Sequence, residues 1–115
     1  MRLFYSPDRP ATGAVLTLNA NVTSLSGEPL RARARAMIRE IYRHTGGKLP
    51  IIGVGGIASA ADAYAHIRAG ASAVELYTGL IYHGPAMVGA LKAGLCRMLR
   101  SDGLRSIDEA VGRDA

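Results

Sequence analysis

Apolar residues recur at helical spacing from Leu30 to Tyr42, and this pattern predicts a helix over that stretch. Gly46 and Gly47 end the pattern, as glycines do at many helix C-termini. Residues 51–54 then form a continuous apolar run bounded by glycines, which is typical of a strand covered on both faces in a parallel sheet. Residues before Leu30 are interrupted by prolines and glycines, so we expect irregular structure there.

The alternation continues beyond this strand. Ser59 fits an N-cap, and Asp62 three positions later resembles a capping box, so a second helix should run to about Arg68. We expect its inner face to carry Ala63, Tyr64 and Ile67. Gly70 should end it in left-handed geometry, and residues 73–77 read as a second strand.

Pro85 can open a third helix with apolar positions as far as Leu99, and a last short helix is predicted at 106–111 from its cap Ser106 and Glu109. The resulting order of helix, strand, helix, strand, helix favours βαβ units, with a right-handed crossover and a parallel sheet. The predicted fold class is therefore α/β.

Composition and charge add few constraints. The chain has 115 residues and a net charge of +5, which is compatible with binding anions. Arg31, Arg35 and Arg39 are four positions apart and share a helix face, which we interpret as a solvated outer face. A nucleic-acid groove would need stacking aromatic side chains, and this stretch has only Tyr42, so no nucleic-acid partner is expected.

The single cysteine, Cys96, has no partner for an internal disulfide or a metal site. It lies in an apolar helical pattern, which favours an inert buried thiol. No apolar run reaches the length of a membrane span.

Candidate chemistry lies directly after the two predicted strands, at Gly55-Gly56 and at Tyr77-Thr78-Gly79. A turn without Cβ atoms lets the backbone present N–H groups to an anion, and a following helix adds a positive dipole end. In barrels, the ends of the last two strands often form a joint phosphate site. A Gly-Gly pair can equally be only a turn, and both interpretations stay open at this point.

Other polar residues are weaker candidates. His44 and His66 lie on predicted helices, where surface or packing roles are common. His83 follows the second strand and could face a ligand, but no acid or metal ligand stands beside it, so a surface role is favoured. Glu75 lies in an apolar strand and would need a partner if it were buried. We predict no catalytic set and no metal site.

Five segments follow one another along the chain: LSGEPL at 25–30, PIIGVGGI at 50–57, RAGASAVELYTG at 68–79, YHGP at 82–85 and the stretch 102–112. In this order and spacing they resemble dihydroorotate dehydrogenases of the membrane-associated, quinone-using class. The resemblance runs from residue 25 to residue 115, whereas residues 1–24 form an irregular segment outside it.

The resemblance implies a (β/α)8 TIM barrel that holds FMN over dihydroorotate, which is oxidised to orotate while the electrons pass to a quinone. It also implies peripheral attachment to the cytoplasmic side of the inner membrane, or a cytoplasmic location if the membrane segment is absent. The family positions that contact FMN correspond to Gly27, Gly56, Tyr77 and Thr78, with Gly55 and Gly79 as neighbours in the same cradle.

In this family the catalytic serine, the substrate asparagines and the flavin lysine belong to the first half of the barrel. We therefore expect an incomplete barrel here, namely the last two parallel strands with their flanking helices, and no catalytic residue. Its partner would be the missing N-terminal half. Two alternatives are a non-catalytic phosphate-binding or interaction module and a fragment of another FMN barrel oxidoreductase.

Two parallel strands alone leave an open edge on each side, and open edges template aggregation. The apolar residues expected to need neighbours are Ile51, Ile52, Val54, Val74 and Leu76. We predict that the isolated chain is molten, oligomeric or aggregated.

Overall fold

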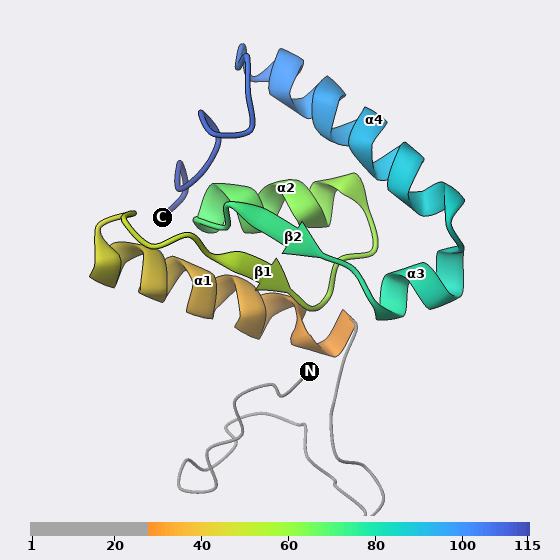
Figure 1. Ribbon diagram of the computed structural model, residues 1–115, viewed down its shortest axis with the longest axis horizontal. Helices are drawn as coiled ribbons and strands as arrows, with labels where there is room; N and C mark the ends of the chain where they lie inside the picture. The colour runs from red at the N-terminus through yellow and green to blue at the C-terminus, as the bar shows by residue number, and fades with distance from the viewer. Residues whose placement is uncertain (1–27) are drawn as a thin grey trace, which may run out of the picture.

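The computed structural model describes residues 28–115, in which helices and strands alternate (Figure 1). The elements in chain order are η1 (Glu28–Leu30), α1 (Arg31–Thr45), β1 (Ile52–Val54), α2 (Ala60–Ala69), β2 (Ala73–Glu75), α3 (Thr78–His83) and α4 (Ala86–Ser101). The predicted α/β alternation is confirmed, and α3 is an additional short helix. Gly27 lies outside the described residues.

The two strands pair in parallel, with Ile52 opposite Ala73 and Gly53 opposite Val74. Both strands point the same way, and the start of α1 and the short α3 lie at their carboxyl ends (Figure 1). A Cβ placed on Gly53 would contact side chains from α1 and α2, whereas the neighbouring Ile52 is 64% exposed. Since successive side chains of a strand point to opposite faces, the helices cover one face of this pair and leave the other open in the described part of the chain.

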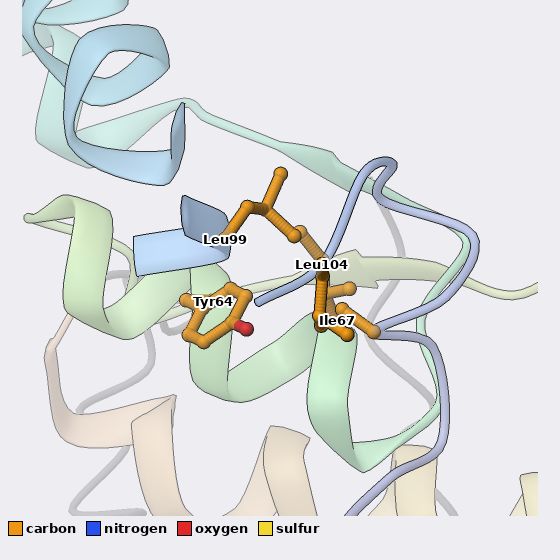
Figure 2. Close-up of a cluster of buried hydrophobic side chains, with 5 residues drawn as sticks. Tyr64, Ile67, Leu99 and Leu104 are labelled. Carbon is orange, nitrogen blue, oxygen red and sulfur yellow. The ribbon is translucent and has the colours of Figure 1, made fainter. Parts of the chain in front are cut away.

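Helix α2 lies at the centre of the apolar packing. Tyr64 and Ile67 pack with Leu99 of α4 and with Leu104 and Ala110 of the C-terminal segment (Figure 2). On its other sides, α2 and the residues after it contribute to two further clusters. One contains Ile38, Ile51, Ala69 and Ala71, and the other contains Ile57, Ala63, Met87 and Leu91. The predicted inner face of Ala63, Tyr64 and Ile67 is confirmed.

Local signals fix the ends of the helices. The Ser59 side chain accepts a hydrogen bond from the Asp62 N–H and caps α2 as predicted. Gly46 ends α1 in the left-handed region at φ 61°. Gly70 also has a positive φ, but at 127° and ψ 4° it lies outside the left-handed helical region, so that detail of the prediction is wrong.

Three other expectations are corrected. Strand β2 ends at Glu75, two residues before the predicted end. Residues 106–111 form a series of turns closed by i→i+3 bonds such as Ala110 N–H to the Ile107 carbonyl, because so short a segment does not repay helix nucleation. Glu109 accepts from the N–H of Arg105, outside the predicted capping box.

The environment of Cys96 also differs from the expectation. Its thiol is exposed on α4, because Leu95 and Leu99 turn toward α2 and leave position 96 on the outer side. Among the helices of residues 28–115, none combines the length and apolar character needed to cross a bilayer.

Candidate functional site

The turn after β1 depends on two glycines. Gly55 has φ 99° and Gly56 has φ 72°, values that side chains with a Cβ rarely adopt. A Cβ on Gly56 would clash with Cα of Arg31, so only glycine lets the start of α1 approach this closely. The turn leads from β1 toward α2, where the sequence placed it.

Both carbonyl groups of this turn contact polar side chains. Nε2 of His66 lies 3.0 Å from the Gly55 carbonyl oxygen, and Nε of Arg31 donates to the Gly56 carbonyl oxygen at 3.0 Å. These side chains come from α2 and α1, so two helices hold one turn. The same face of α2 also carries Asp62, whose Oδ1 lies 3.1 Å from Nε of Arg31.

Asp62 completes the N-terminus of α2. Its Oδ2 accepts hydrogen bonds from the Ala58 N–H at 3.2 Å and from the Ser59 hydroxyl at 2.9 Å. The carboxylate therefore satisfies donors of the first turn and also pairs with Arg31. A negative side chain at a helix N-terminus is stabilised by the helix dipole.

The turn after β2 lies against the first one. A Cβ on Gly79 would stand 2.5 Å from the Ile57 carbonyl oxygen, so the two turns are in direct backbone contact. Tyr77 is 67% exposed beside them, and Thr78 is the first residue of α3. The structure thus brings the predicted residues at 55–56 and 77–79 to one edge of the sheet.

His66 is the only fully buried large side chain among the described residues. Nδ1 lies 3.0 Å from the Asp62 carbonyl oxygen, so both ring nitrogens face acceptors. Burial lowers the pKa of His66, the nearby charge of Arg35 lowers it further, and the carbonyl contacts oppose the shift. A neutral imidazole donates from one nitrogen only. Protonation of His66 would let both nitrogens donate to the two carbonyl oxygens, but burying the charged ring would cost desolvation free energy.

The arginine face of α1 differs from its prediction. Arg31, Arg35 and Arg39 are half-buried, and the Nε atoms of Arg35 and Arg39 are buried without a hydrogen-bond partner among residues 28–115. The solvated outer face is therefore wrong for this stripe. At Arg31 the stripe turns into the fold, where Nε lies within 3.1 Å of Asp62 on α2.

The remaining candidates have plainer positions. His44, Glu75 and His83 are exposed. Within residues 28–115 no group of His, Cys, Asp and Glu side chains could hold a metal ion.

The sequence pattern did not identify Arg31 and His66 as parts of this site. His66 follows Asp62 by one helical turn, so it shares the face of the capping carboxylate. That spacing could have placed His66 near the glycine turn. Nothing in the pattern indicated that Arg31 would turn toward Gly56, because the contact joins residues 25 positions apart.

Comparisons with known proteins match this chain to one family. The family model described as dihydroorotate dehydrogenase matches residues 12–99, and its range begins within segment 1–24. The chain is 58% identical to a dihydroorotate dehydrogenase (quinone) of Roseiflexus castenholzii over 97 residues, or 84% of this chain and 26% of that protein. The corresponding protein of Parvibaculum lavamentivorans is 53% identical over 103 residues, or 89% of this chain and 30% of that protein.

Solved structures agree. A ligand-free dihydroorotate dehydrogenase (DHODH) from Eimeria tenella matches with a TM-score of 0.79 and 38% identity, over 95% of this chain and 30% of that one. DHODH from the same organism in complex with ferulenol matches with a TM-score of 0.75 and 43% identity, over 77% of this chain and 24% of that one. The predicted fold class, parallel strands of a TIM barrel with flanking helices, is confirmed. The chain spans between a quarter and a third of the length of these curated relatives.

Proposed function

The chain belongs to the dihydroorotate dehydrogenase family, and on that premise we propose that it supplies the FMN phosphate-binding part of an enzyme that oxidises dihydroorotate to orotate. A quinone would accept the electrons, since the relatives are named as quinone enzymes. The dihydroorotate site and the catalytic groups would be supplied by the remaining part of the barrel. No residue of this chain is proposed as catalytic.

The observation that carries the proposal is the glycine turn after β1. Gly55 and Gly56 have positive φ, and their carbonyl groups are held by His66 and Arg31. Such a turn at the N-terminal side of a helix fits a phosphate group, because its backbone can approach the anion and donate N–H groups. The residues present therefore fit the phosphate of FMN.

Beside this turn, the contact between Gly79 and Ile57 brings the second strand's turn to the same edge. We propose that the backbone of Gly55, Gly56 and Gly79 lines the phosphate cradle. Tyr77 and Thr78 would border it, and Gly27, which lies outside the described residues, is proposed as a further contact. When bound, FMN supplies the two-electron redox chemistry, and the protein supplies binding, orientation and electrostatics.

We also propose peripheral attachment to the inner membrane from the cytoplasmic side, since the relatives are named as quinone enzymes and a membrane-dissolved quinone could be reached there. This proposal concerns the natural full-length protein. A membrane flotation assay of that protein tests it, and recovery only in the soluble fraction would contradict it.

A direct experiment tests the enzymatic proposal. The full-length protein that carries this chain is purified, and its flavin is released and identified by absorbance and chromatography. Dihydroorotate-dependent reduction of a soluble quinone is then measured. We expect FMN and turnover together. Bound FMN without turnover would support the non-catalytic module instead, and the absence of flavin would refute both.

A further inference from the structure

Two consecutive carbonyl groups of the glycine turn contact polar side chains from two different helices. Nε2 of His66 lies 3.0 Å from the oxygen of Gly55, and Nε of Arg31 donates to the oxygen of Gly56 at 3.0 Å. Both contacts span the fold, since they join residues 11 and 25 positions apart. The orientation of both peptide planes is therefore set from outside the turn.

The direction of the following N–H groups is a consequence of this arrangement. The described peptides are trans, so each C=O and the next N–H point in opposite directions. The Gly56 N–H thus points away from His66, and the Ile57 N–H points away from Arg31. Neither N–H donates to another of residues 28–115, so both donors are left for an acceptor outside the described part.

Asp62 ties the two side chains together. Its Oδ1 lies 3.1 Å from Nε of Arg31, and its backbone carbonyl oxygen lies 3.0 Å from Nδ1 of His66. The same residue caps α2 through Ser59. Because Asp62 is fixed by the helix terminus, it limits the orientations open to both partners.

We propose that His66 and Arg31 are positioning residues for the FMN phosphate. His66 and Arg31 orient the carbonyl groups of Gly55 and Gly56 toward themselves. The N–H groups of Gly56 and Ile57 then point to the opposite side, where they face the phosphate. This inference rests on the proposed function, because it takes FMN as the ligand. Neither side chain needs to touch the flavin. A pre-oriented pair of donors binds an anion without reordering the backbone, which would otherwise weaken affinity.

The test compares FMN with riboflavin, which has the same ring system and no phosphate. Affinities are measured by flavin fluorescence with the full-length protein after removal of bound flavin. His66→Leu and Arg31→Met should each weaken FMN binding by about tenfold, the loss expected for one displaced hydrogen bond, and leave riboflavin binding unchanged. His66→Gln keeps a donor and should retain affinity to within about threefold.

Matched controls lie on α1. His44→Leu and Arg33→Met make the same changes at exposed positions and should leave FMN affinity unaltered. Equal weakening of FMN and riboflavin by His66→Leu and Arg31→Met would indicate general structural damage and overturn the inference. Unaltered FMN affinity in these variants would also overturn it. A wild-type protein that binds neither flavin would instead refute the proposed function.

A second measurement needs no variant. Inorganic phosphate is titrated into the flavin-free wild-type protein, and the backbone amide resonances of Gly56 and Ile57 are followed by NMR. Both should shift with saturation, because their N–H groups would donate to the anion. If these two resonances stay fixed while others move, the donors are not at the phosphate site and the inference is wrong.

Discussion

Arg68 and Asp114 form a two-pronged ion pair across 46 positions of the sequence. Nε of the arginine donates to Oδ2 of the aspartate at 2.9 Å, and Nη2 donates to Oδ1 at 2.8 Å. The remaining nitrogen, Nη1, reaches Oδ2 of Asp102 at 2.8 Å. One side chain of α2 thus holds both the end of α4 and the C-terminal segment.

We predict that Arg68→Gln loosens the C-terminal segment without unfolding α2. The segment would keep its apolar contacts through Leu104 and Ala110, but would lose its charged attachment. Hydrogen exchange at Gly112 and Asp114, whose amides donate to carbonyl groups of α2, should become faster. Arg100→Gln, an exposed change on α4, is the control, and equal exchange in both variants would contradict the role of Arg68.

Tyr64→Phe should lower the free energy of unfolding by about 1 kcal/mol. The Tyr64 hydroxyl donates to Oδ2 of Asp102 at 2.6 Å from a largely buried position, and burial together with this bond raises the pKa of the phenol. Tyr82→Phe removes the hydroxyl of a residue that is 79% exposed and should have no effect. Urea unfolding of both variants measures the difference, and equal midpoints would show that the bond contributes nothing.

Gly56→Ala should destabilise the protein by roughly 1–3 kcal/mol and abolish FMN binding. The new Cβ would meet the main chain of Arg31, and the residue would have to keep a φ of 72°. Gly89→Ala places the same methyl group in open space on α4 and should stabilise the protein by about 0.5–1 kcal/mol. A Gly56→Ala protein with normal stability and FMN affinity would exclude the close approach described here.

Stability should fall as the pH drops below about 6.5, the ordinary pKa of histidine, because burial lowers the pKa of His66 in the folded state. Below that value the unfolded chain takes up a proton that the folded protein resists, so acid favours unfolding. The contribution is at most about 1.4 kcal/mol per pH unit. Urea unfolding at pH 7.5 and 5.5 should show a smaller pH effect for His66→Gln than for wild type, and identical pH effects would contradict it.

Sequence patterns predicted those features of the structure that depend on residues close together in the chain. The cap at Ser59, the inner face of α2 and the two glycine turns each depend on neighbouring residues. The arginine stripe of α1 and the exposure of Cys96 depend on packing between distant segments. The capping pattern at 106–111 was present, but so short a segment does not repay helix nucleation. The same limit applies to the site, where the glycines could be identified but the contacts of His66 and Arg31 could not.

The open face of the sheet is the surface through which the isolated chain is expected to self-associate. Ile51 is buried, and Val74 and Leu76 pack against the helices. Contrary to the expectation, these three residues therefore have neighbours within the described part of the chain. Ile52, however, is 64% exposed on the open face of the sheet. We predict that the isolated chain associates through this face and that Ile52→Thr reduces the association.

Size-exclusion chromatography of the 115-residue chain measures this effect. Leu49→Thr, at a residue that is 51% exposed and precedes the strand, is the control. A monomeric wild-type chain with strongly protected amides at 52–54 and 73–75 would refute the prediction.

The parallel pairing of β1 and β2 also bears on the order in which the chain folds. The paired residues Ile52 and Ala73 enclose only α2, so the loop to be closed is short and its entropic cost is small. Contacts between α1 or the C-terminal segment and α2 close longer loops. The strand–helix–strand unit is therefore expected to form before the contacts that secure α1 and the C-terminal segment to α2.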